Sequence, residues 1–265
     1  MEDAPLFLGL DLSTQSLTAL VVEQSGTVVA RSSVNYDQEL PHYKTSSGMH
    51  RAAEGGGERV TSPVLMWLEA FDMAIERVGR TGVLGRVVAV SASAQQHGSV
   101  YWKVGARQKL QALGASQLKL KDALAGCFAC EDCPIWADSS THEECAAMEA
   151  ALGGAERLAA MTGTKYCKSS LDCAFTLQMY SAVTFSEFVP PGPGSRAYPR
   201  FTAQQFARMS RRHPDVWAAC ERVSLVSSFV SSILSGDYAA IDTVPRSQKR
   251  KMLFGGLLLV NILGH

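Results

Sequence analysis

The feature that most constrains the fold is a pair of apolar runs near the start of the chain, joined by a short polar turn. Residues 7–12 and 17–22 are both rich in side chains that favour a pleated strand, and Asp11 stands near the end of the first run. The turn between them consists of Ser13, Thr14, Gln15 and Ser16. Such a turn can hold a phosphate, and the Asp11 carboxylate can hold Mg²⁺ through water; an ordinary hairpin with a polar tip has the same composition.

After this hairpin, strand and helix patterns alternate. Residues 27–34 predict a third strand, and the polar, glycine-rich residues 35–57 predict a loop. Pro63 marks the first turn of an amphipathic helix that continues to Val78. Residues 86–93 form a nearly continuous apolar run, which predicts a buried, parallel strand. Three hairpin-connected strands followed by a helix and a parallel strand predict an α/β domain with a mixed sheet and flanking helices, which is the start of the ribonuclease-H-like layout.

The later residues give weaker patterns. Residues 101–104 predict a strand, and residues 108–124 fit either helix or loop. Thr141 and Glu144 have the spacing of a capping box and predict the start of a helix whose apolar side continues to Met161. Two shorter helices are predicted at residues 203–209 and 214–222.

Polar side chains follow the predicted parallel strand directly. Gln95, Gln96 and His97 combine hydrogen-bond donors and acceptors of the kind that sort sugar hydroxyls. A single histidine at a strand end can equally have a structural role. Further along, Asp138 either touches a sugar or braces the site, and Trp136 either lies at the site or simply packs.

Several of these stretches resemble one family. Gly9-Leu10-Asp11-Leu12-Ser13-Thr14-Gln15-Ser16 resembles the first phosphate motif of the actin-like ATPase superfamily, in the form used by the FGGY carbohydrate kinases. That family usually has glycine where Ser13 stands. Gln95-Gln96-His97-Gly98 resembles the sugar-binding turn of its pentulose kinases, and Trp136-Ala137-Asp138 resembles its Trp-x-Asp segment. Many bacterial members carry arginine shortly after that aspartate, where this chain has Ser139 and Ser140.

The resemblance covers residues 6–163 and 195–242 and implies a domain organisation. It implies an FGGY-kinase N-terminal domain over residues 6–242, with the actin-like ATPase fold in incomplete form. Residues 164–194 match nothing in the family and end in a Pro- and Gly-rich stretch, so they are either a lid or a translated noncoding segment. Residues 243–265 are expected to be a divergent, unstructured tail, with the C-terminal FGGY domain absent; their basic cluster alternatively fits a nuclear or membrane-surface signal.

The resemblance also implies an activity, the phosphorylation of D-xylulose to D-xylulose 5-phosphate with ATP and Mg²⁺. Asp11 would be the metal-side carboxylate, and the phosphates would lie near Ser13, Thr14 and Gln15. The sugar would be held by Gln96, His97, Asp138 and Arg200. The family's base, an aspartate in a Gly-Asp-Asn turn, does not occur in these 265 residues, so no catalytic residue is assigned and turnover by this chain is not expected. The alternatives are a non-catalytic isoform or interaction module, or a kinase for another sugar or polyol.

Composition limits the remaining classes. Lys and Arg number 25, as do Asp and Glu, so neither nucleic acid nor a membrane is an expected partner. Residues 1–5 have no signal-peptide pattern and residues 253–263 are too short to span a bilayer, which predicts a cytosolic protein. Seven cysteines are present. Residues 127, 130 and 133 are three apart but lack a fourth ligand at matching spacing, and free thiols are expected over a metal site.

Overall fold

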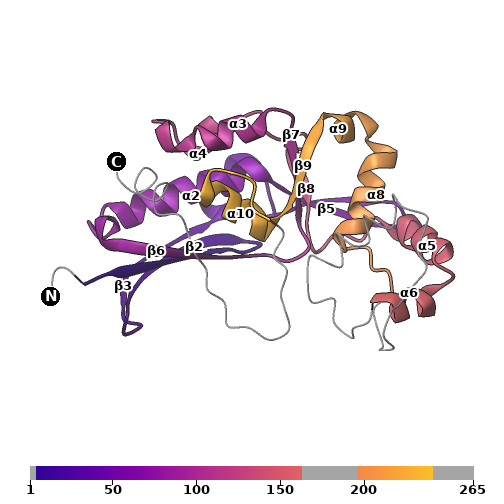
Figure 1. The fold of residues 1–265 in the computed structure, drawn as a ribbon, viewed down its shortest axis with the longest axis horizontal. Helices are drawn as coiled ribbons and strands as arrows, with labels where there is room; N and C mark the ends of the chain where they lie inside the picture. The colour runs from indigo at the N-terminus through magenta and orange to yellow at the C-terminus, as the bar shows by residue number, and fades with distance from the viewer. Residues whose placement is uncertain (1–3, 163–195, 241–265) are drawn as a thin grey trace.

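The chain is described here by a computed structural model that covers residues 4–162 and 196–240. Its main sheet has the strand order β3-β2-β1-β6 (Figure 1). The first three strands are antiparallel neighbours, and β6 runs parallel to β1, as the sequence predicts. The strands are β1 (Leu6–Leu12), β2 (Ser16–Glu23), β3 (Val28–Asn35) and β6 (Val87–Ala94).

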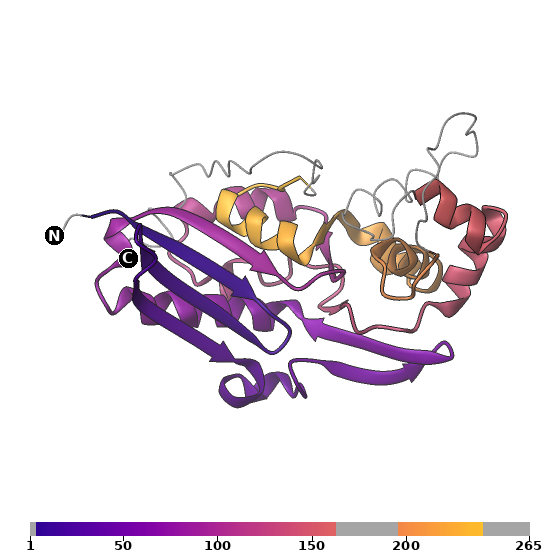
Figure 2. The same ribbon diagram turned by 90° about the horizontal axis from the view of Figure 1, so that it is seen from below.

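Two helices cover one side of this sheet. Helix α2 (Val64–Gly79) packs across β2 and β3, and α10 (Val226–Ser235) packs across β6 (Figures 1 and 2). Because side chains alternate along a strand, every second residue of β1 points into this layer. These buried residues are Leu6, Leu8, Leu10 and Leu12.

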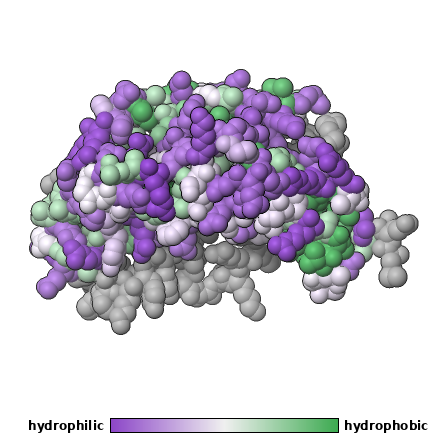
Figure 3. Space-filling view, turned by 180° about the vertical axis from the view of Figure 1, so that it is seen from behind, coloured by the Kyte–Doolittle hydropathy of each residue, from purple (hydrophilic) through white to green (hydrophobic). Residues whose placement is uncertain are grey.

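The predicted burial of the parallel strand is only partly correct. Val90 is buried on β6, but Val88 is 62% exposed. Among the described residues β6 pairs with β1 alone, so its other edge is open. Val28 and Val29, at the start of β3, are also exposed. Viewed from behind, the surface is hydrophilic over most of its area, with a compact apolar patch at one edge (Figure 3).

The predicted loop at residues 35–57 contains regular structure. It holds the short helix α1 (Tyr36–Glu39), a 3₁₀ turn at Pro41–Tyr43 and strand β4 (His50–Glu54). The turn of Gly55 and Gly56, both with positive φ, connects β4 to the next strand. The prediction missed β4 because its side chains are largely exposed and therefore carry no apolar alternation.

The β4 strand belongs to a second, antiparallel sheet of order β4-β5-β8. Strand β5 (Gly57–Pro63) pairs with β8 (Asp132–Pro134). Pro63 is therefore the last strand residue and not the first helical turn, and α2 begins at Val64. A third pairing joins β7 (Ser99–Lys103), which confirms the strand predicted near Tyr101, to β9 (Cys220–Leu225).

The remaining helices are short. Residues 108–124 hold both helix and loop, and the helix predicted over 214–222 ends at Ala219 because the chain enters β9. The predicted helix after Thr141 is broken at Gly153 and Gly154, which both have positive φ. These helices are α3 (Ala106–Gln111), α4 (Leu120–Ala123), α5 (His142–Ala151), α6 (Ala155–Thr162), α8 (Thr202–Arg212) and α9 (Pro214–Ala219), with 3₁₀ turns at Leu84–Arg86 and Leu113–Ala115.

The predicted capping box does not form. Thr141 precedes α5, but its side chain makes no cap hydrogen bond; its hydroxyl donates instead to the Pro199 carbonyl at 2.6 Å. The Glu144 carboxylate lies 3.7 Å from the Arg212 guanidinium of α8. Tertiary partners therefore replace the local cap.

Two predicted segments lie outside the described residues: the insert at 164–194 and the tail at 243–265. Within the described ranges, no helix is both long enough and apolar enough to cross a membrane.

Candidate functional site

A pocket of about 640 Å³ lies at the carboxyl ends of β1 and β6. Open α/β sheets bind ligands at this edge of neighbouring parallel strands. Four segments of the chain line the pocket. They are the turn after β1, the turn after β6, Trp136 and Arg200. Every predicted site residue except Asp138 lines this pocket, namely Asp11, Ser13, Thr14, Gln15, Gln96, His97 and Arg200.

Asp11 is oriented by two hydroxyl groups. Ser13 Oγ donates to one carboxylate oxygen at 2.6 Å, and Ser93 Oγ donates to the other at 2.8 Å. Ser93 lies directly across from Asp11 in the parallel register of β1 and β6. The carboxylate remains exposed towards the pocket. An accessible carboxylate oxygen fits Mg²⁺, which proteins usually hold through one or two carboxylates together with water and substrate phosphates.

The turn after β1 is supported from behind. The Ser13 backbone N–H donates to the Ser16 carbonyl at 3.0 Å, and the Tyr36 hydroxyl donates to the Ser13 carbonyl at 3.1 Å. Burial, and then the nearby Asp11 carboxylate, raises the pKa of Tyr36 far above its usual value, so the phenol keeps its proton. Gly48 approaches so closely that a Cβ there would lie 2.1 Å from the Thr14 carbonyl oxygen. The turn is therefore held in place before any ligand binds.

His97 adopts an unusual backbone conformation. Its φ is 61°, in the left-handed region that non-glycine residues rarely adopt and that often marks functional sites. Its ring centroid lies 5.3 Å from that of Phe201. Burial, and then the charge of Arg200, lowers the pKa of His97, so the imidazole is neutral at pH 7 and offers one donor and one acceptor.

Arg200 also lines the pocket. Its guanidinium carbon lies 5.8 Å from the centroid of the Tyr198 ring, within range of a cation–π contact. Arg200 is exposed, and its planar guanidinium group presents several hydrogen-bond donors in a fixed geometry. Arg200 and His97 come from segments more than 100 residues apart in sequence, and only the tertiary structure brings them to one pocket.

Three residues at the site were missed or underrated from sequence. Trp136 was predicted either to lie at the site or simply to pack; it is 42% exposed, and its indole N–H donates to Thr14 Oγ1 at 2.9 Å. Ser93 could have been found from the strand register alone. Gln95 was named with Gln96 and His97 but was given no sugar contact; it lines the pocket, and its amide has no hydrogen-bond partner.

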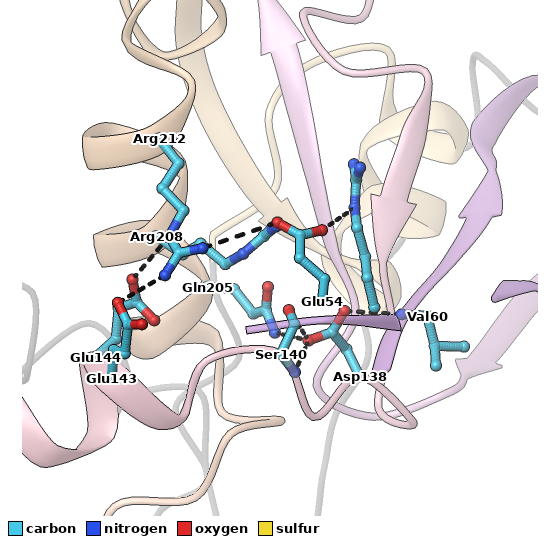
Figure 4. Close-up of polar contacts among 10 residues, drawn as sticks. Glu54, Val60, Asp138, Ser140, Glu143, Glu144, Gln205, Arg208 and Arg212 are labelled. Atoms are coloured by element: carbon cyan, nitrogen blue, oxygen red, sulfur yellow. Dashed lines mark hydrogen bonds and ion pairs between the residues drawn. The ribbon is translucent and has the colours of Figure 1, made fainter. Parts of the chain in front are cut away.

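Asp138 is buried and does not line the pocket. One carboxylate oxygen accepts the Val60 N–H at 2.8 Å. The other accepts the Ser140 N–H at 3.0 Å, the Ser140 hydroxyl at 2.8 Å and the Gln205 amide at 2.7 Å (Figure 4). Of the two predicted roles, sugar contact and bracing, these contacts support bracing, because the carboxylate is surrounded by protein donors.

The cysteines form no evident metal centre in the part of the chain that is described. Residues 4–162 and 196–240 contain no cluster of three or more His, Cys, Asp or Glu side chains placed to hold an ion. Cys127, Cys130 and Cys133 are free thiols, as are Cys145 and Cys220.

Comparison with known proteins identifies relatives that match most of the chain. No protein-family model matches the chain. Xylulose kinase 2 of Arabidopsis thaliana is 39% identical over 238 residues, and xylulose kinase of Rattus norvegicus is 38% identical over 236 residues. Each match covers 89% of this chain. The chain is a homologue of the N-terminal part of xylulose kinases.

This homology confirms the predicted carbohydrate kinase relationship, although the chain spans only 37% and 38% of those two relatives. The crystal structure of xylulose kinase from Rhodospirillum rubrum matches with a TM-score of 0.56 at 14% identity, and the match covers 88% of this chain and 35% of that one. At this identity the likeness concerns the fold alone. It confirms the predicted fold, the actin-like ATPase fold of sugar kinases.

Proposed function

We propose that this chain is the sugar- and phosphate-binding part of a kinase that phosphorylates D-xylulose with Mg-ATP. The observation that carries the proposal is the single pocket that joins the turn at Asp11 to His97 and Arg200. One side of this pocket suits phosphate and a metal ion, and the other suits sugar hydroxyls. The homology to xylulose kinases supports D-xylulose as the sugar.

We assign each pocket residue a role from its position in the pocket. The Ser13 and Thr14 hydroxyls and the backbone of the turn through Gln15 would bind the transferred phosphate, as polar turns and backbone N–H groups bind anions. Asp11 would hold Mg²⁺, which when bound neutralises charge on the phosphates. Gln96, the neutral His97 imidazole and the Arg200 guanidinium would orient the sugar. Asp138 would act indirectly, through the backbone that it braces.

These 265 residues by themselves are expected to bind the sugar without turning it over. Phosphoryl transfer needs a base near the attacking hydroxyl and a nucleotide held in line. No Gly-Asp-Asn turn occurs in the chain. Loss of a general base alone costs roughly 10²- to 10⁴-fold in rate. The five described free thiols are consistent with a cytosolic location, which is part of the same proposal.

Two measurements test this function. Calorimetry with the purified chain is expected to detect D-xylulose binding, with weaker binding of glycerol and D-ribulose. A coupled ADP-release assay with D-xylulose and Mg-ATP is expected to give no sugar-dependent signal. Failure to bind D-xylulose while another polyol binds would contradict the assigned sugar. Sugar-dependent ADP release that Asp11→Asn abolishes would show that the chain is catalytic.

A further inference from the structure

The backbone carbonyl that precedes Arg200 is held by two buried side chains. The Pro199 carbonyl oxygen accepts a hydrogen bond from Thr141 Oγ1 at 2.6 Å and another from Gln205 Nε2 at 3.2 Å. Thr141 is fully buried and Gln205 is 2% exposed. Gln205 Nε2 also donates to Asp138 Oδ1 at 2.7 Å.

This arrangement bears directly on Arg200 because of peptide geometry. The Pro199 carbonyl and the Arg200 N–H belong to one planar unit. A carbonyl held by two donors therefore fixes the direction in which the chain enters Arg200. The proline ring also restricts φ of Pro199 itself. The Phe201 N–H donates to the Tyr198 carbonyl at 3.0 Å, which closes a tight turn around the same two residues.

The Gln205 donor is itself connected to the second sheet. Asp138, which orients the Gln205 amide, accepts the Val60 N–H of β5. One turn further along α8, the Arg208 guanidinium pairs with the Glu54 carboxylate of β4 (Figure 4). Helix α8 thus contacts the β4–β5 hairpin directly through Arg208 and indirectly through Gln205, by way of Asp138. The turn that carries Arg200 is connected through these contacts to a framework outside the pocket.

We infer that Thr141 and Gln205, with Asp138 as the group that orients Gln205, are positioning residues for Arg200. They set the guanidinium against the side of the pocket where His97 lies, and they thereby contribute to sugar affinity without touching the sugar. The inference rests on the proposed function for its consequence on binding. Thr141 supports it independently, because its hydroxyl leaves the N-terminus of α5 uncapped and bonds to Pro199 instead.

Hydrogen exchange tests the positioning without any ligand. Thr141→Val and Gln205→Leu remove one donor each while keeping side-chain size. Exchange of the Phe201 amide is expected to become about ten-fold faster in both variants, because the turn opens more often. Two controls are matched: Thr141→Ser keeps the hydroxyl, and Gln204→Leu removes an equally buried glutamine that contacts Met148 instead of Pro199. Unchanged exchange in both test variants would overturn the inference.

Calorimetry with D-xylulose tests the consequence. Thr141→Val and Gln205→Leu are expected to weaken binding about ten-fold, while Thr141→Ser and Gln204→Leu stay within about two-fold of the parent chain. In an Arg200→Ala background the same two substitutions should cause no further loss. An equal loss in that background would show that they act by general destabilisation, and would overturn the inference.

The two experiments separate the possible failures. Lack of D-xylulose binding by the parent chain would contradict the proposed function, and the exchange rates would still decide the positioning role. Thermal melts identify any variant that fails to fold. Because Thr141 and Gln205 lie on different elements, loss of one variant leaves the other as a test.

Discussion

The two sides of the pocket are held together by different forces. The sheet region, β1, β2, β3 and β6 with α2 and α10, is built on a continuous apolar core that includes Leu8, Trp67 and Phe229. The helical region, α5, α6 and α8, has a small apolar cluster of its own around Met148 and Leu158, and α8 also contributes Phe206 and Met209 to the main core. Figure 2 shows the two regions at opposite ends of the molecule.

The helical region compensates with buried polar contacts. Arg208 and Gln205 are each 2% exposed, yet both are hydrogen-bonded to charged partners across elements. Apolar packing tolerates small changes of geometry, whereas a buried ion pair requires both partners in place. The strands that carry the phosphate side of the pocket therefore rest mainly on packing, whereas Arg200 on the sugar side depends on polar geometry.

The largest effect is expected in the apolar core. Trp67 is 1% exposed on α2, and its ring centroid lies 6.2 Å from that of Phe229. Trp67→Ala should lower the free energy of unfolding by about 3–5 kcal/mol, because it leaves a cavity. Urea denaturation measures this loss. Val88→Ala, at an apolar residue that is 62% exposed, is the control and should change stability by less than about 0.5 kcal/mol. Equal effects at the two positions would contradict a continuous core.

The next effect concerns the buried ion pair of the helical region. Arg208→Met should lower the free energy of unfolding by about 2–3 kcal/mol, below the roughly 3–5 kcal/mol of fully buried pairs, because the Glu54 side chain is 31% exposed. The double variant Arg208→Met with Glu54→Gln should recover part of this loss, since the side chain that loses Arg208 then carries no charge. Chemical denaturation of the parent chain, the two single variants and the double variant gives the coupling. If Arg208→Met were as stable as the parent chain, the helical region would not depend on this ion pair, and the proposed difference between the two regions would be contradicted.

The two walls of the pocket should respond separately. His97→Ala and Arg200→Ala should each weaken D-xylulose binding by about 1–2 kcal/mol, because each leaves a sugar hydroxyl without its partner. Asp11→Asn changes the phosphate wall and should leave sugar affinity within about two-fold. Calorimetry on the three variants makes the comparison. A larger loss for Asp11→Asn than for Arg200→Ala would reverse the assignment of the walls.

The smallest effect is a pH-dependent one in the sheet region. The hydrogen bond from Arg77 lowers the pKa of Glu39 from its ordinary 4.5, against the opposing effect of burial. A lowered carboxyl pKa stabilises the fold above pH 4.5, and this contribution is lost as the pH falls through the folded-state pKa.

Glu39→Gln should therefore cost less than about 1 kcal/mol at pH 7, because both side chains of the pair are partly exposed. The difference from the parent chain should vanish in acid. Thermal melts from pH 7 downwards measure it. A difference that persists at low pH would indicate a packing effect instead of a charge effect.

The sequence was sufficient for the parts whose contacts are local. The strands around the turn at Asp11 and the amphipathic helix after Pro63 follow from apolar periodicity, because a half-buried strand or helix requires that spacing. The motif at residues 9–16 and the turn at 95–98 also indicated two sides of one site. Both stretches follow the parallel strands β1 and β6, and for that reason their residues line one pocket.

Tertiary structure alone decided the rest. The exposed strand β4 carries no periodic signal. The Thr141 hydroxyl is directed to the Pro199 carbonyl and makes no cap hydrogen bond to the first turn of α5. Asp138 looked like a ligand residue, yet four protein donors surround its carboxylate. Such outcomes depend on groups that lie far apart in sequence. The hydrogen-bond partner of a polar side chain depends on which groups lie near it in the folded structure, and the order of residues alone does not determine this.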